Sequence, residues 1–145
     1  MRAALAEAEK ARDYDEVPIG AVVWVGGEIV GAGFNQPIRA VDPTAHAEIV
    51  AMRAAARAVG NYRLVGATLC VTLEPYAMCV GALVHARVER LIFGALEPKT
   101  GAVRSVSNLL DQPWWNHRVE VVSGVLESRC AELVQAFFRA KRAQR

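Results

Sequence analysis

The first third of the chain changes from a helical pattern to an apolar, β-branched one near Val17. Ala, Leu, Glu and Lys without a helix breaker predict a helix over residues 3–12. Apolar runs follow over residues 19–25 and 28–34, and Gly26-Gly27 between them can supply the positive φ angles of a tight turn. The pattern therefore predicts an antiparallel hairpin directly after a helix.

The rest of the chain alternates helical segments with strand-like ones. A polar loop is expected over residues 35–42, and a helix is expected to begin at Pro43 or Thr44 and to end at Gly60. Further along, the pattern predicts a strand over 67–73, a helix over 77–86, strands over 88–93 and 119–122, and a helix over 127–142. Strands that alternate with helices favour parallel pairing, so the fold class is α/β with a mixed sheet.

Length and composition predict one domain that spans residues 1–145. A chain of 145 residues that is 53% apolar can bury a single core. The apolar run at residues 19–25 is too short to cross a membrane, and Glu7, Glu9 and Lys10 interrupt the stretch where a signal peptide is hydrophobic. Three widely spaced cysteines suit a reducing compartment. We therefore expect a soluble, cytoplasmic protein with no membrane association.

Two short segments carry the residues with metal and acid–base chemistry. His46-Ala47-Glu48 falls in the first turn of the second long predicted helix, and Pro75 to Cys79 opens the third. Both follow strands, so we expect them at one edge of the sheet, where helix N-termini supply free N–H groups and positive potential. A histidine and a thiolate there can bind zinc, a zinc-bound water has a pKa of about 7, and a carboxylate can move its proton. The segments predict a hydrolytic zinc site.

The order of HAE and EPYAMC resembles the H-x-E…P-C-x-x-C signature of zinc-dependent nucleoside and nucleobase deaminases. Within that superfamily the chain resembles the bacterial tRNA adenosine deaminases over nearly its whole length. The segments that carry this likeness are, in order, EVPIGAVV, NQPI, DPTAHAEI, NYRL, ATLCVTLEP, GALVHARV, FGALEPKTGA, NHRVEV and FFRAKR. HAE alone would be weak evidence, whereas the ordered set is specific.

The resemblance implies a cytidine-deaminase-like, three-layer α/β/α fold with a five-stranded mixed sheet, and a homodimer. It implies zinc-dependent, hydrolytic deamination of adenosine to inosine at the wobble position of a tRNA anticodon loop. In the family pattern His46 and Cys79 match zinc ligands, and Glu48 matches the catalytic proton shuttle. Asn35 matches the asparagine that hydrogen-bonds the flipped nucleoside, and Ala47 matches the residue whose backbone N–H lies near the reacting base.

Two further segments are candidates for contact with RNA. Asn116, His117 and Arg118 match the loop that helps to shape the dimer and the RNA groove. The basic end of the chain is typical either of a solvated helix face or of a surface that follows phosphates. Its residues are Arg139, Lys141, Arg142 and Arg145, of which the first three are the candidate RNA contacts.

Two residues depart from the family pattern. Tyr76 stands where the pattern has its first motif cysteine, and a phenol with a pKa of about 10 is a poor zinc ligand. Only His46 and Cys79 then remain where three protein ligands are expected, and we expect Tyr76 to cover the pocket. Arg104 stands where the family usually has glycine, and it would either add phosphate affinity or disturb the loop backbone.

These departures leave three functions open. The first is an active tRNA adenosine deaminase, which needs a third metal ligand. The second is a catalytically impaired deaminase or pseudoenzyme that still binds nucleic acid, with zinc absent or below one ion per chain. The third is a deaminase of free guanine or cytosine, which shares the zinc motif. NHRVEV and the basic FFRAKR favour a tRNA substrate over a free base.

Overall fold

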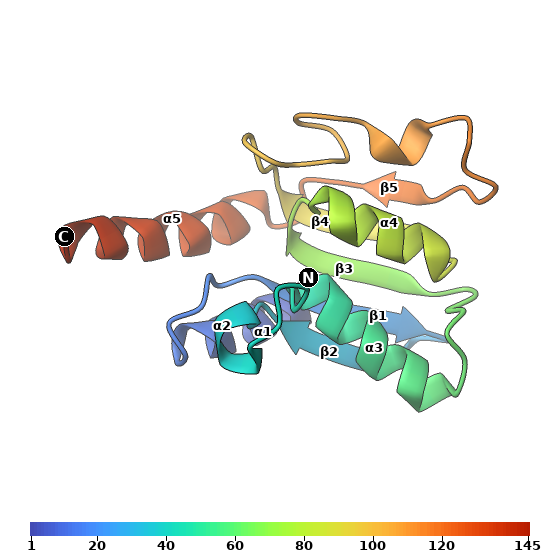
Figure 1. The fold of residues 1–145 in the computed structure, drawn as a ribbon, viewed down its shortest axis with the longest axis horizontal. Coiled ribbons are helices and arrows are strands. Elements are labelled where there is room, and N and C mark those ends of the chain that lie inside the picture. The colour runs from blue at the N-terminus through green and yellow to red at the C-terminus, as the bar shows by residue number, and fades with distance from the viewer.

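The protein has three layers, with a mixed five-stranded sheet between helices, in a computed structural model that describes residues 1–145 (Figure 1). The strands are β1 (Gly20–Val25), β2 (Glu28–Phe34), β3 (Thr68–Leu73), β4 (Arg90–Ala95) and β5 (Glu120–Val122). The helices are α1 (Arg2–Arg12), α2 (Pro37–Ala40), α3 (Ala47–Val59), α4 (Ala77–His85) and α5 (Glu127–Ala143), with a short 3-10 helix, η1 (Leu109–Asp111). A helix with the length and apolar character of a membrane span is absent.

The sheet combines antiparallel and parallel pairing, as the sequence predicted. Its strand order is β2-β1-β3-β4-β5, with β1 antiparallel to both of its neighbours. The β3–β4 and β4–β5 pairs are parallel. Gly26 and Gly27 close the β1–β2 hairpin with φ angles of 59° and 82°, a region that suits glycine. The hairpin prediction is therefore confirmed.

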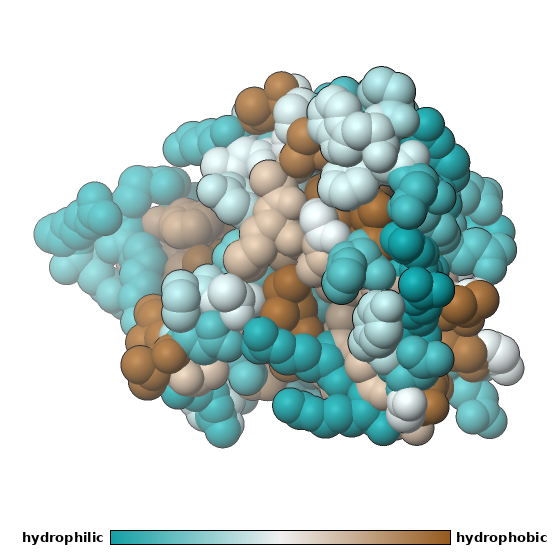
Figure 2. All heavy atoms as spheres, turned by 45° about the vertical axis from the view of Figure 1, so that its right-hand side comes forward, coloured by the Kyte–Doolittle hydropathy of each residue, from teal (hydrophilic) through white to brown (hydrophobic).

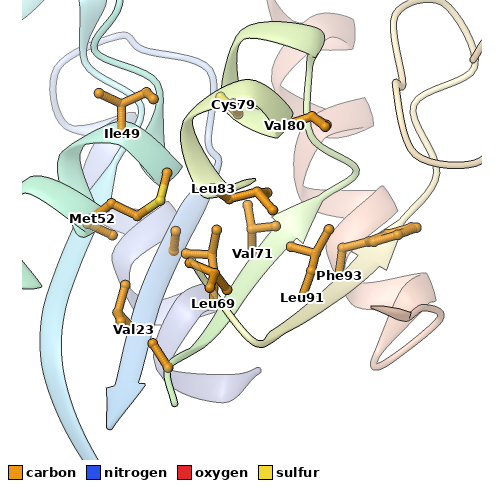
Figure 3. Close-up of a cluster of buried hydrophobic side chains, with 14 of the residues drawn as sticks. Val23, Ile49, Met52, Leu69, Val71, Cys79, Val80, Leu83, Leu91 and Phe93 are labelled. Atoms are coloured by element: carbon orange, nitrogen blue, oxygen red, sulfur yellow. The ribbon is translucent and has the colours of Figure 1, made fainter. Parts of the chain in front are cut away.

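The strands direct alternate side chains into two separate apolar layers. In β3, Leu69 and Val71 belong to the main core, and Figure 3 shows them near Leu83 of α4. Cys70, between them in sequence, packs instead with Ala4 of α1. This alternation places α3 and α4 on one face of the sheet and α1 on the other, which leaves the N-termini of α3 and α4 at one end of the same face.

The last helix covers the α1 face of the sheet only at its beginning. Cys130 packs with Leu5 and Ala95, and it is the only buried residue of α5. Beyond it α5 projects from the body of the molecule (Figure 1), and the surface of that projecting end is mostly hydrophilic (Figure 2). Phe138, near the end of the helix, is exposed.

The predicted start of α3 is wrong by three or four residues. The helix begins at Ala47, because the residues before it form a different local structure. The Ala45 N–H donates to Asp42 O at 3.1 Å and the His46 N–H to Thr44 O at 2.7 Å, so tight turns replace helical bonds here, and His46 itself is extended. The Asp42 side chain supports the first turn, since its Oδ1 accepts the Thr44 backbone N–H at 2.9 Å and the Thr44 hydroxyl at 2.7 Å. The predicted polar loop before this turn holds the short helix α2, with Pro37 at its first turn.

The fourth strand lies two residues further along than expected, over Arg90–Ala95 rather than 88–93. Val88 donates its N–H to Leu83 O at 3.1 Å and so still belongs to the end of the α4 connection. Its apolar side chain is buried, which explains why the pattern alone assigned it to the strand.

Candidate active site

The N-termini of α3 and α4 bring the two predicted chemical segments together. His46 is the N-cap of α3, with extended backbone angles, and Cys79 lies in the first turn of α4. The His46 Nδ1 and Cys79 Sγ atoms are 3.6 Å apart. Figure 3 shows Cys79 on α4 beside Val80, above the main core, and the cysteine is fully buried. The prediction that both segments meet at one edge of the sheet is correct.

A cavity of about 180 Å³ opens beside this pair, and of the two residues only His46 lines it. Polar groups from four different segments face it, and its lining includes Asn35, His46, Glu48, Glu74, Tyr76, Glu97 and Thr100. A larger groove of about 740 Å³ runs beside α5 and shares Glu97, Thr100 and Phe138 with the cavity wall. A small cavity with both polar and apolar walls that adjoins a larger groove can take one unit of a chain while the groove holds its neighbours.

Burial sets the protonation of the three central groups. Burial raises the pKa of Glu48 to about 7, although hydrogen bonds from its own backbone N–H and from Cys79 oppose that rise. Burial also raises the pKa of the Cys79 thiol, and the Glu48 carboxylate raises it further. The sequence led us to expect that the helix N-terminus lowers the pKa of Cys79 and makes it a thiolate. In the protein without a metal, burial and Glu48 outweigh that effect and favour the thiol. Burial lowers the pKa of His46, which favours the neutral imidazole.

The His46 and Cys79 pair has the spacing of two ligands on one zinc ion. Zinc–nitrogen and zinc–sulfur bonds in a tetrahedral site place the two atoms about 3.6 Å apart, and the observed distance is 3.6 Å. No group of three His, Cys, Asp or Glu side chains that could hold a metal exists in the chain. The donor set is therefore one protein ligand short of the three that a catalytic zinc site uses.

Tyr76 does not complete this set. It is the N-cap of α4, and the residue is 47% exposed. Its ring meets the His46 ring edge to face, with ring centroids 5.9 Å apart. The tyrosine thus forms part of the cavity wall, as the sequence led us to expect.

Asn35 is a buried polar side chain that faces the cavity. It is 7% exposed, and its side-chain amide makes no hydrogen bond within the chain, whereas its backbone N–H donates to Ile19 O at 2.9 Å. The amide is therefore free to pair with a ligand. Ala47 is fully buried at the first position of α3, where a helix N–H has no partner inside the helix.

The loop that was predicted to contact RNA, residues 116–118, does not line the cavity. His117 Nε2 lies 2.7 Å from Val88 O, which ties the loop to the α4–β4 connection, and Arg118 donates to Gln112 O at 3.0 Å within the loop. Asn116 belongs to the same loop and does not line the cavity. The RNA contacts of this loop stay a prediction.

The basic end of the chain lies along the groove. Arg139 and Arg142 line it, while Lys141 forms an ion pair with Asp15.

Arg104 has a negative φ angle, so this departure from the family pattern leaves the loop backbone unstrained. Its backbone N–H donates to Glu74, at 2.7 Å.

The sequence reasoning missed Glu74 as a site residue. It lies directly after β3, lines the cavity and is only 3% exposed. A charged residue at the end of the apolar run ATLCVTL was the available signal.

Comparison with known proteins finds matches over nearly the whole chain. The model of the MafB19-like deaminase family matches residues 1–142. A tRNA-specific adenosine deaminase of Haemophilus influenzae is 47% identical over 146 residues, which are 100% of this chain and 84% of that protein. One of Bacillus subtilis is 47% identical over 145 residues, which are 100% of this chain and 90% of that protein.

A solved structure has the same fold. It comes from a study of A-to-I editing by tRNA deaminases at the wobble position of transfer RNA. The match has a TM-score of 0.89 and 47% identity, over 92% of this chain and 96% of the other.

Proposed function

Because the chain belongs to the family of tRNA-specific adenosine deaminases, we propose that its cavity receives the wobble adenosine of a tRNA anticodon loop for hydrolytic deamination to inosine. The observation that carries this proposal is the His46–Cys79 pair, 3.6 Å apart beside the buried Glu48. A single-stranded loop suits such a site, since an unpaired base can be splayed out into a small cavity.

Each polar group of the cavity has one role in this proposal. Glu48 contacts Cys79 and carries protons to and from the reacting base. The free amide of Asn35 hydrogen-bonds the nucleoside and fixes its orientation in the cavity. The buried N–H of Ala47, at the start of α3, faces the reacting part of the base. His46 lines the cavity, and Cys79 lies directly behind it, so the two would hold the metal at that wall.

We further propose that this chain binds zinc at well below one ion per protomer, so that it deaminates slowly while it still binds tRNA. Deaminases of this superfamily use zinc to activate water. His46 and Cys79 would hold the ion, but Tyr76 is half exposed and offers only a phenol at the third position. The incomplete donor set favours an impaired deaminase over a fully active one.

Zinc content of the chain and of Tyr76→Cys tests the metal proposal. Elemental analysis is expected to find the chain nearly free of zinc and the Tyr76→Cys variant close to one zinc per protomer, since a thiolate completes the three-ligand set. Tyr76→Phe is the matched control, because it removes only the phenol oxygen and should leave the zinc content as low as before. One zinc per protomer in the unaltered chain, lost in Tyr76→Phe, would make Tyr76 the third ligand and overturn the proposal.

The substrate is tested separately on an anticodon stem-loop RNA. Tyr76→Cys loaded with zinc should convert its wobble adenosine to inosine, which mass spectrometry detects as a change of one mass unit. An unlabelled free base should not compete with the RNA for binding, whereas a free-base deaminase would show such competition. A zinc-filled variant that binds free guanine and ignores the RNA would reject the tRNA substrate.

We also propose a cytoplasmic homodimer. A groove between α3 and α4 has an apolar lining that includes Ile49, Met52, Tyr62 and Ala82, which suits the association of two copies. All three cysteines are free, which fits a reducing compartment. Light scattering after size exclusion should give twice the 15.7 kDa mass of the chain.

A further inference from the structure

One buried carboxylate, that of Glu74, collects five hydrogen bonds from a single loop. The loop spans residues 96–106, between β4 and η1. One carboxylate oxygen accepts the Glu97 N–H at 3.0 Å and the Ser105 hydroxyl. The other accepts the backbone N–H groups of Val103 at 3.1 Å, Arg104 at 2.7 Å and Ser105 at 3.0 Å.

This arrangement fixes the path of the loop. Three successive backbone N–H groups converge on one oxygen, a concave arrangement of donors that favours a negatively charged acceptor. Gly101 passes so close that a Cβ atom there would lie 2.3 Å from the carboxylate carbon of Glu74. The only other hydrogen bond from this loop to a distant segment runs from the Ala102 N–H to Pro75 O, at 2.9 Å.

The same loop forms one wall of the candidate active site. Glu97 and Thr100 line both the cavity and the groove beside α5. Glu74 lies two residues before Tyr76, the N-cap of α4. Its carboxylate therefore links the start of α4, the helix that contains Cys79, to the loop that forms the opposite wall of the cavity. A shift of the loop would therefore change the shape of the site without touching the His46–Cys79 pair.

We propose that Glu74 is a positioning residue for substrate, which holds the 96–106 loop so that Glu97 and Thr100 form the cavity wall against the bound nucleotide. This inference rests on the proposed function of the site. It assigns the five hydrogen bonds a role in RNA affinity, beyond a contribution to the stability of the fold. Fluorescence anisotropy with a labelled anticodon stem-loop measures that affinity directly, whether or not the chain holds zinc.

The test compares the chain with Glu74→Gln. Glutamine keeps the size of the side chain but sets an NH₂ group against backbone N–H donors, so part of the loop loses its acceptor. The dissociation constant for the stem-loop is expected to rise roughly tenfold. Hydrogen exchange of the 103–105 amides should accelerate in the same variant, while amides of the sheet should keep their protection. In the zinc-filled Tyr76→Cys background, Glu74→Gln should raise KM more than it lowers kcat.

Two further variants separate positioning from simple destabilisation. Gly101→Ala crowds the carboxylate without removing its charge, and it should weaken RNA binding in the same direction. Val23→Ala creates a cavity in the core on β1, away from the loop, and it should lower the free energy of unfolding without changing RNA affinity.

An unchanged dissociation constant in Glu74→Gln would overturn the inference, and so would an equal loss of affinity in Val23→Ala. If the unaltered chain does not bind the stem-loop at all, the proposed function fails. Hydrogen exchange then still tests whether Glu74 holds the loop. Unchanged exchange of the 103–105 amides in Glu74→Gln would show that it does not.

Discussion

At the scale of single residues, the ionisation of Asp42 is set by its near neighbour Thr44. The Thr44 hydroxyl and backbone N–H both donate to the Asp42 carboxylate, and Arg53 donates to it at 3.1 Å. The hydroxyl contributes most, and together these bonds hold the pKa of Asp42 below its ordinary value despite a small opposing effect of burial.

Replacement of Thr44 by Ala should raise the pKa of Asp42 towards its ordinary value. A carboxylate whose pKa is lowered by folding stabilises the fold above its unfolded-state pKa, and this stabilisation is lost as the pH falls through the folded-state pKa. The acid side of the stability curve should therefore be less steep in Thr44→Ala, because less stabilisation remains to be lost. An NMR titration of the Asp42 carboxyl carbon measures the shift, and an unchanged pKa would show that the backbone N–H of residue 44 and Arg53 set the pKa without the hydroxyl.

The residues of the candidate site differ in how far the sequence could identify them. His46, Glu48 and Cys79 stand in two short segments with a recognisable spacing, so the sequence located them, and the structure brings them together. The poor fit of Tyr76 as a ligand also followed from its side-chain chemistry. Glu74 could not be assigned this way, because its partners lie 23 to 31 residues further along the chain and only the folded loop brings them to it.

At the scale of elements, most long periodic segments were predictable, whereas the start of α3 and the short helix α2 were not. The apolar periodicity placed α1, the β1–β2 hairpin and α5 within one or two residues. The start of α3 was misplaced, because proline and threonine are common at helix starts, whereas here the backbone of residues 42–46 forms tight turns and His46 is extended. The short helix α2 has a single turn and so produces no periodic signal.

The contact between β2 and α3 depends on the absence of a side chain at Gly31. A Cβ atom there would lie 2.4 Å from Ala51 O in the α3 backbone, so Gly31→Ala must push the helix away from the sheet. We expect the free energy of unfolding in urea to fall by about 1–3 kcal/mol.

Gly81→Ala is the matched control for this substitution. Gly81 lies inside α4, and a Cβ atom there would meet nothing within 4 Å. Since glycine inside a helix is less stable than alanine, this change should raise the free energy of unfolding by about 0.5–1 kcal/mol. If both substitutions changed the free energy of unfolding equally, the close packing of β2 on α3 would not explain why residue 31 is a glycine.

At the scale of the whole molecule, the projecting helix α5 extends the site beyond the cavity. Its exposed end is hydrophilic (Figure 2), and Arg139 and Arg142 line the groove together with Lys99. Arg139 is paired with Glu132 at 2.6 Å, whereas Arg142 has no ion-pair partner. An arginine without a partner beside a groove that leads to the cavity is placed to meet a phosphate of a bound RNA strand.

Arg142→Gln should therefore weaken binding of the anticodon stem-loop and reduce its dependence on salt. Loss of one phosphate contact on a single strand lowers the slope of log affinity against log salt by about 0.7. Arg57→Gln is the matched control, because Arg57 is exposed in the last turn of α3, at the opposite end of that helix from His46. Anisotropy titrations over a range of salt concentrations measure both slopes. If the two variants show the same slope as the unaltered chain, α5 does not follow the RNA backbone, and the groove beside it serves only to shape the entrance to the cavity.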